Sequence, residues 1–252
     1  MRETPETGAL ALEWIDGDMP YSPEFGDHFY CREDGRAECG HVFLAGNGLP
    51  DRWAEGLAFT IGELGFGTGL NFCETWRVWE NVWNGEKASA ETPPALHFVS
   101  FELHPMDRAS IGKALSRWPV LDARRRILTA RWPERPEGVV DLDFGGVRLT
   151  VVCGDALTNL TASGFIMDAW YLDGFAPSRN PALWSEAMLR AVHDHTRPGG
   201  RFATYAAAGF VRRNLVAAGF AVERRPGFAG KREMLCGERP ATGRSLPAAS
   251  PS

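Results

Sequence analysis

Residues 58–72 read AFTIGELGFGTGLNF, and this stretch decides the fold class. An apolar run ends at Glu63, glycines follow at positions 65, 67 and 69, and a helix-like pattern opens at Leu70. Glycines at alternate positions remove side chains where a chain turns sharply after a strand and where its backbone approaches a ligand. The pattern therefore predicts a strand, a ligand-binding turn and a helix. An ordinary glycine-rich turn is the alternative.

The ligand favoured by this turn carries positive charge. A dinucleotide fingerprint would place its third glycine at position 70, where Leu70 stands. The Glu63 carboxylate would repel a pyrophosphate, whereas it suits the ammonium and sulfonium groups of S-adenosylmethionine (SAM). The E-x-G-x-G-x-G form resembles the first motif of SAM-dependent methyltransferases.

Apolar strands alternate with amphipathic helices from Phe59 to about residue 204. This alternation predicts an α/β fold with a doubly wound, mostly parallel sheet that has helices on both faces. Near the end, AVERR (221–225) and REMLCG (232–237) are separated by a short link, so they must pair antiparallel. We therefore expect a seven-stranded, Rossmann-like sheet of the SAM methyltransferase type, with an antiparallel last strand.

Composition shifts divide the chain into three parts. Residues 1–57 hold short alternating pieces, HFYCRED and ECGHVFLAG, which predict a β-rich N-terminal extension packed on the main domain. Residues 58–239 form the predicted methyltransferase domain. Residues 240–252, rich in Pro, Ala and Ser, predict a disordered tail or the start of a linker.

The predicted strands end in acids: Glu63, Glu102, Asp155 and Asp173. Ligands of such sheets bind beyond the carboxyl ends of the strands. Glu102 suits a ribose diol and Asp155 an adenine amino group, although each acid alone is also a good helix cap. Asp173 is the candidate for chemistry, because a carboxylate there can orient an amine and accept its proton. A capped strand-to-helix turn is the alternative for Asp173.

Composition limits the classes of function. The five cysteines are scattered without a C-x-x-C pair, which favours reduced thiols over disulfides or zinc. No apolar run is long enough to span a bilayer, and the first residues lack the apolar core of a signal peptide, so we expect a cytoplasmic protein without a membrane partner. His193 and His195 are two apart in a predicted helix and face different sides, so we expect no metal site.

The charge is unevenly distributed. The formal net charge is −5, yet residues 197–239 hold nine bases against three acids. Phosphate recognition depends on local potential more than on the sum over the chain. This excess allows RNA as a partner, while solvated helix and strand faces are the alternative.

Several segments together resemble the bacterial MnmC/MnmD-type tRNA methyltransferases: ELGFGTGLNF, SFELHP, GDA, AWYLDGFAPSRNPALW, RPGGRFATYAAAGFVRRNL and GFAGKREMLCG. The resemblance covers about residues 10–238. It implies methyl transfer from SAM to the amine of 5-aminomethyl-2-thiouridine at the tRNA wobble position, giving 5-methylaminomethyl-2-thiouridine, with Asp173 as the catalytic residue. By motif position it implies a SAM site made of Glu63, Gly65, Phe66, Gly67, Gly69, Glu102, Asp155, Ala156 and Asp173.

The same resemblance implies contacts with the tRNA anticodon stem-loop. Phosphates are expected at cationic side chains, and unstacked loop bases at aromatic ones. The substrate-binding candidates are Phe175, Arg179, Asn180, Arg212, Arg213, Lys231 and Arg232, with Trp184 and Phe228 as further stacking candidates. For each of the three aromatic residues a buried core ring is the alternative, and it is favoured for Trp184. In many family members a flavin-dependent oxidase that generates the amine is fused to this domain. The partner here is then a fused or a separate FAD-dependent oxidase, and we expect no flavin in this chain.

Two other classes of function stay open on the sequence alone. One is a SAM-dependent methyltransferase that acts on a small-molecule or protein amine. The other is a SAM-binding or RNA-binding module without methyl transfer, including an aminopropyl-transfer or regulatory module on the same sheet. The basic excess and the specific LDGFAP segment favour tRNA methylation over both.

Overall fold

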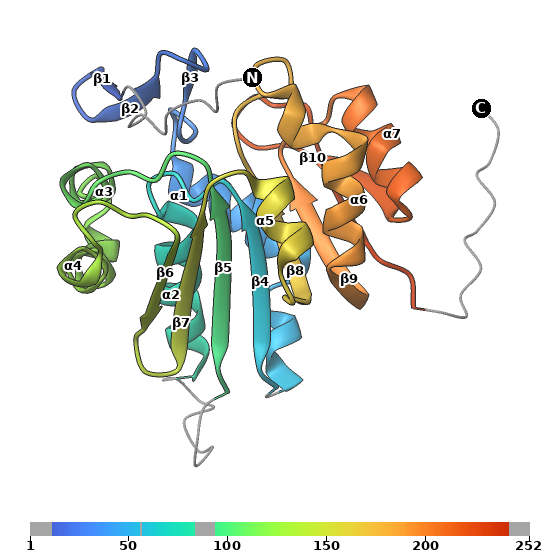
Figure 1. Ribbon diagram of the computed structural model, residues 1–252, viewed down its shortest axis with the longest axis horizontal. Helices are drawn as coiled ribbons and strands as arrows, with labels where there is room; N and C mark the ends of the chain where they lie inside the picture. Colours follow the sequence, from blue (N-terminus) through green and yellow to red (C-terminus); the bar gives the residue numbers. More distant parts are fainter. Residues whose placement is uncertain (1–11, 56, 84–93, 242–252) are drawn as a thin grey trace, which may run out of the picture.

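A computed structural model describes residues 12–55, 57–83 and 94–241 of the chain. Its centre is a sheet of eight strands in the order β10-β11-β9-β8-β4-β5-β7-β6 (Figure 1). The strands are β4 (Phe59–Leu64), β5 (Leu96–Glu102), β6 (Val139–Asp143), β7 (Val147–Cys153), β8 (Met167–Leu172), β9 (Thr196–Thr204), β10 (Ala221–Pro226) and β11 (Glu233–Glu238).

The five central strands run parallel, and the two edges are antiparallel. β9, β8, β4, β5 and β7 pair in parallel, so their carboxyl ends meet at one edge of the sheet. β11 pairs antiparallel with β9, and β10 pairs antiparallel with β11, as the short link between them requires. The strand order reverses between β4 and β8, which are neighbours, and a ligand site is expected there.

The central strands are apolar on both faces because helices cover both. β8 is buried along its whole length, with Trp170 on one side of the sheet and Tyr171 on the other. Gly62 of β4 leaves the space that the Trp170 ring fills, since a Cβ at Gly62 would lie 2.6 Å from that ring. The sequence of this strand is therefore fitted to its neighbour.

Helices form two layers on the sheet (Figure 1). One face is covered by the N-terminal helices, α2 (Leu70–Trp83), α3 (Arg108–Leu115) and α4 (Asp122–Arg131), which share a core with Ile61 and Phe98. The other face is covered by α5 (Ala156–Ala162), α6 (Glu186–Asp194) and α7 (Gly209–Ala218), which pack around Val99 and Phe202. Short 3₁₀ segments lie at η4 (Pro119–Leu121) and η5 (Pro181–Trp184).

The N-terminal segment combines a small sheet with a helical stretch. β1 (Glu13–Ile15), β2 (Met19–Ser22) and β3 (Asp27–His28) form the antiparallel sheet. After it come α1 (Gly35–Glu38), the π-helix η1 (Cys39–Leu44), and 3₁₀ segments η2 (Ala45–Asn47) and η3 (Asp51–Glu55). The small sheet that the sequence predicts is confirmed, but it is built from residues 13–28, and both pieces expected to be β are wrong. In HFYCRED only His28 belongs to a strand, and residues 29–34 form bends and turns. At ECGHVFLAG the chain is helical, since Asp34 caps a helix there by accepting from the amides of Arg36 and Ala37.

The main sheet is confirmed as a doubly wound, mostly parallel sheet, but the count of seven strands is one too few. The additional strand, β6, pairs antiparallel with β7 at the edge of the sheet. Its sequence VVDLD is mostly exposed, so it lacks the apolar run that marks the central strands. The domain boundaries stay a prediction, and most of the expected tail, residues 242–252, lies outside the described residues.

Candidate active site

The glycine turn after β4 has the backbone geometry that its sequence predicts. Gly65, Gly67 and Gly69 have φ angles of 85°, 52° and 73°, in the left-handed region that favours glycine. The turn lies against the loop after β8, since a Cβ at Gly65 would lie 3.5 Å from Gly174 Cα. The loops after the two central strands therefore meet, and α2 begins directly after the turn.

A cavity of about 630 Å³ opens at the carboxyl ends of the parallel strands. Its wall includes the glycine turn, the ends of β5 and β8, the start of α5, and segments from both the N-terminal and the C-terminal regions. Ten of the residues predicted for the site line it: Gly65, Phe66, Gly67, Glu102, Asp155, Ala156, Asp173, Phe175, Asn180 and Lys231. The topology thus brings together acids that are widely separated in the sequence.

Two acids of the cavity wall are held in place by backbone amides. The Glu102 carboxylate accepts from Gly67 N at 2.9 Å and from His104 N at 2.8 Å, which fixes it across the glycine turn. Asp155 accepts from Thr158 N at 2.8 Å and so caps α5 while it also lines the cavity. The capping alternative for Asp155 is therefore observed, and it coexists with a position on the wall.

Glu63 lies beneath the cavity and not on its wall. Its side chain is fully buried and accepts from Ser100 Oγ at 2.7 Å and from Asn71 Nδ2 at 3.0 Å. Burial raises the pKa of Glu63 well above its usual range, and these hydrogen bonds oppose the shift. Gly69 also does not line the cavity; it faces the Phe66 ring at the start of α2.

Asp173 stands at the end of β8, on the cavity wall. Its carboxylate accepts from Asn71 Nδ2 and from Gly174 N, both at 2.8 Å. Burial raises the pKa of Asp173 from 3.8 to about 7, the Glu38 charge adds to the rise, and the Gly174 and Asn71 hydrogen bonds and the Lys231 charge oppose it. A carboxyl group with a pKa near neutrality is suited to accept and release a proton.

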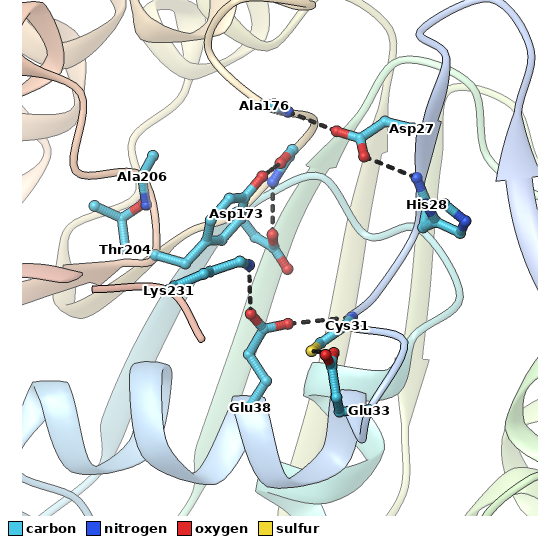
Figure 2. Close-up of polar contacts among 12 residues, drawn as sticks. Asp27, His28, Cys31, Glu33, Glu38, Asp173, Ala176, Thr204, Ala206 and Lys231 are labelled. Atoms are coloured by element: carbon cyan, nitrogen blue, oxygen red, sulfur yellow. Dashed lines mark hydrogen bonds and ion pairs between the residues drawn. The ribbon is translucent and has the colours of Figure 1, made fainter. Parts of the chain in front are cut away.

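The N-terminal segment closes over the loop that follows Asp173. The Phe175 ring stacks on Phe25 at 4.5 Å between centroids and meets Phe29 edge to face at 5.2 Å. Asp27 accepts from Ala176 N at 3.0 Å (Figure 2), and Arg179 donates to the Phe25 carbonyl at 3.1 Å. Phe175 and Arg179 are thus engaged within the protein, so the stacking face predicted for Phe175 is already occupied on one side by Phe25.

The loop between β10 and β11 supplies another part of the wall. Lys231 Nζ lies 2.7 Å from a carboxylate oxygen of Glu38 on α1 (Figure 2). The same ammonium lies 3.8 Å from the centroid of the Tyr205 ring, and the Tyr205 hydroxyl donates to the Gly174 carbonyl. Lys231, predicted as a phosphate ligand, therefore faces the cavity beside Asp173.

The other predicted substrate contacts lie outside the cavity. Arg179, Arg212, Arg213 and Arg232 are exposed and do not line it. Trp184 is wrong as a stacking platform, because its ring is fully buried and its Nε1 donates to the Phe175 carbonyl. Phe228 is partly buried near His41.

Several residues that line the cavity or contact Asp173 were not predicted from the sequence. Asn71 bridges Glu63 and Asp173, and its only signal in the sequence is an amide in the otherwise apolar first turn of α2. Glu38, Asp27 and Tyr205 belong to segments whose contact with the cavity depends on tertiary packing, so no local pattern marked them.

Two further features bear on the classes of function. Within residues 12–55, 57–83 and 94–241, no group of three or more His, Cys, Asp or Glu side chains is arranged to hold a metal ion. None of the helices in the described ranges has both the length and the apolar composition needed to cross a membrane.

Comparison of the sequence with known proteins identifies a family. Residues 119–240 match the family described as S-adenosyl-L-methionine-dependent methyltransferase. The chain is 44% identical over 247 residues to the tRNA 5-methylaminomethyl-2-thiouridine biosynthesis bifunctional protein MnmC of Chromohalobacter salexigens, covering 94% of this chain and 34% of that protein. It is 42% identical over 238 residues to the protein of the same name from Caulobacter vibrioides, covering 93% and 39%. The chain belongs to the MnmC/MnmD-type methyltransferases.

The predicted family, the SAM cofactor and the assignment as a methyltransferase are thereby confirmed. MnmC2 from Aquifex aeolicus has the same fold, with a TM-score of 0.72 at 20% identity, over 97% of this chain and 75% of that one. This MnmC/MnmD-type chain spans between a third and two fifths of the length of the curated relatives described above.

The cavity fits SAM on its own chemistry. The glycine turn has no side chains at the three positions with left-handed φ angles, so a ligand can approach its backbone closely. Glu102 is fixed beside this turn and can accept hydrogen bonds from a ribose diol. Asp155 lines the same cavity at the start of α5. Carboxylates on this wall favour a cation over a phosphate.

Proposed function

We propose that this chain methylates the primary amine of 5-aminomethyl-2-thiouridine at the wobble position of tRNA, with SAM as donor. The names of its relatives support this substrate, and the position of Asp173 supports the chemistry. The observation that carries the proposal is the Asp173 carboxylate, held by Asn71 and Gly174 on the wall of a cavity suited to a cationic nucleoside.

Bound SAM supplies an electrophilic methyl group on a sulfonium. The residues of this chain then have three tasks. Glu102 and the glycine turn hold the donor, and Asn71 and Gly174 fix the orientation of Asp173. Asp173 accepts a hydrogen bond from the acceptor amine and so orients the lone pair of the amine nitrogen toward the methyl group. As the N–C bond forms and the C–S bond breaks, one amine proton passes to Asp173 and then to water.

Exposed cations near the cavity mouth support an RNA acceptor. α7 begins just after the carboxyl end of β9, which places Arg212 and Arg213 in its first turns, at the same edge of the sheet as the cavity. Arg232 follows Lys231, which lines the cavity, and Arg179 lies in the loop after β8. We infer that these arginines contact the phosphates of the anticodon stem-loop, while Asn180 contacts the substrate inside the mouth.

Two further parts of the proposal follow from the substrate. The acceptor amine must be made first, and we infer a FAD-dependent oxidase as the partner, fused to this chain or separate. The name of the relatives, a bifunctional protein, supports a second activity close at hand. We place the reaction in the cytoplasm, where tRNA is modified.

The test is single-turnover methylation of tRNA that bears 5-aminomethyl-2-thiouridine. We expect Asp173→Ala to bind SAM, seen as a higher melting temperature, but to transfer the methyl group at least about 100-fold more slowly. Glu134→Gln, which changes an exposed acid, is the matched control and should keep the wild-type rate. A wild-type rate in Asp173→Ala, or a wild-type enzyme that methylates only small amines, would reject the proposal.

A further inference from the structure

Glu38 and Lys231 form an ion pair between the two ends of the described chain. Glu38 ends α1, and Lys231 lies in the loop between β10 and β11, yet their charged atoms are 2.7 Å apart. The Glu38 side chain is 9% exposed and the Lys231 side chain 39% exposed. Both residues line the cavity. The pair is therefore part of the wall.

The Glu38 carboxylate is held in one orientation. One oxygen accepts from Lys231, and the other accepts from Cys31 N at 3.2 Å (Figure 2). Burying a carboxylate carries a large desolvation cost, which the partner charge only offsets, so such a pair is weak evidence for a stabilising role. A fixed buried charge on the wall of an active-site cavity calls for another explanation.

Lys231 connects the pair to the loop that carries Asp173. Its ammonium lies over the Tyr205 ring, and the Tyr205 hydroxyl donates to the carbonyl of Gly174, the residue after Asp173. Figure 2 shows Lys231 between Asp173 and Glu38, with Cys31 and Glu33 beside Glu38. Two opposite charges thus stand on one side of the proton acceptor.

We propose that Glu38 and Lys231 are a pair of positioning residues that sets the electrostatic environment of Asp173 during proton transfer, and that Lys231 serves the acceptor site instead of tRNA phosphates. This inference rests on the proposed function. It accounts for the difference between Lys231, whose ammonium pairs with Glu38 on the cavity wall, and its neighbour Arg232, which does not line the cavity.

The directions of the charge effects support this assignment. The Glu38 charge raises the pKa of Asp173 and the Lys231 charge lowers it, each acting on top of the larger rise caused by burial. Other titratable groups that interact electrostatically with this carboxyl include Glu63 of β4, Cys39 of η1 and Tyr205 after β9, and Asp27 of β3 acts on Tyr205. Among these groups, Lys231 is the cation.

The experiment compares Glu38→Gln and Lys231→Met in single-turnover pH profiles with tRNA bearing the aminomethyl group. Lys231→Met leaves Glu38 unopposed, so the acid limb of the profile should move up by about half a pH unit or more. Glu38→Gln leaves Lys231 unopposed, so the limb should move down by a similar amount. The double variant should return toward the wild-type profile, and Lys231→Arg, which keeps the charge, should retain it.

Arg232→Met is the matched control for Lys231→Met. We expect Arg232→Met to weaken tRNA binding and reduce its salt dependence without moving the pH profile. Lys231→Met should do the reverse. The inference is overturned if the pH profiles of Glu38→Gln and Lys231→Met shift in the same direction or do not shift. It is also overturned if Lys231→Met loses as much tRNA affinity as Arg232→Met.

A second measurement separates this inference from the proposed function. The ¹³C shift of the Asp173 carboxyl, assigned with Asp173→Asn, can be followed against pH without any substrate. Opposite displacements of its titration in Glu38→Gln and Lys231→Met support the pair's role even if wild-type protein does not methylate tRNA. Unmoved titration in both variants rejects the role even if tRNA methylation succeeds.

Discussion

The Asp173 carboxylate accepts hydrogen bonds, which favour its charged form, and it is buried, which disfavours that form. Asn71 and Gly174 donate to its two oxygens, yet burial prevails and the pKa rises to about 7. Groups tuned in this way are common at catalytic sites, and they reduce the stability of the folded protein. That cost can be measured.

We expect Asp173→Asn to gain stability relative to wild type as the pH rises. Between pH 4 and pH 7 the carboxyl is ionised in the unfolded chain but largely protonated in the folded protein, because its folded pKa of about 7 exceeds the ordinary 3.8. The folded state then binds more protons, so wild-type stability falls over this range, and the asparagine variant lacks this loss.

The measurement is urea unfolding of both proteins at pH 4, 6 and 8. The difference in unfolding free energy, variant minus wild type, should increase by at least about 1 kcal/mol from pH 4 to pH 8. A difference that is independent of pH would contradict the raised pKa.

Asn71→Ala tests the bridge between Glu63 and Asp173. Removal of the amide takes away a donor that lowers the pKa of Asp173, so the pKa should rise further and the acid limb of the methylation profile should move to higher pH. A shift of one unit reduces the rate on that limb about tenfold. Asn214→Ala removes an amide on α7 that donates to the Trp184 carbonyl of η5, and it should leave the limb in place.

At the scale of elements, the alternation of apolar strands and amphipathic helices was enough to predict the central sheet. The strands that were predicted are buried on both faces, as β8 is, and their apolar runs are continuous. β6 was not predicted because an edge strand that is mostly exposed needs no continuous apolar run. The helical stretch 35–47 was not predicted because its apolar residues also fit an alternating pattern, and Asp34 before Gly35 is as typical of a turn as of a helix cap.

Two glycines in regular elements should respond in opposite ways to alanine. A Cβ at Gly62 in β4 would lie 2.6 Å from the Trp170 ring and 2.9 Å from Met167 Cγ, so Gly62→Ala overpacks the sheet and should cost about 1–3 kcal/mol. A Cβ at Gly112 in α3 meets Thr129 Cγ2 at 3.6 Å, an ordinary contact, so Gly112→Ala should gain about 0.5–1 kcal/mol from helix propensity. Denaturant midpoints decide; equal effects would show that β4 can shift to make room.

At the scale of the whole molecule, the sequence predicted the acids at the strand ends better than the walls that enclose them. Glu102, Asp155 and Asp173 were found because parallel strands bring their carboxyl ends to one edge. Glu38 and Tyr205 were not, because their approach to Asp173 depends on how the N-terminal segment and the final hairpin pack. Lys231 was predicted from its charge alone, and only the fold shows that its ammonium pairs with Glu38 on the cavity wall.

The distribution of charge over the molecule predicts how tRNA binding responds to salt. Arg212 and Arg213 are exposed at the start of α7, at the cavity edge of the sheet. If each contacts a phosphate, the double variant Arg212→Ala/Arg213→Ala should reduce the slope of log affinity against log salt by about 2 and weaken binding at low salt. Arg126→Ala, an exposed arginine on α4, is the control, and an equal effect there would place the RNA elsewhere.

The pairing of Glu38 with Lys231 also has a consequence for biosynthesis. The ribosome releases Glu38 almost two hundred residues before its counter-ion, so the growing polypeptide holds this carboxylate without a partner until the last hairpin is made. Hydration satisfies the lone acid in the meantime, and its dehydration must wait for the hairpin to arrive. The part of the cavity wall formed by this pair is therefore completed only after residues 221–238 have been synthesised.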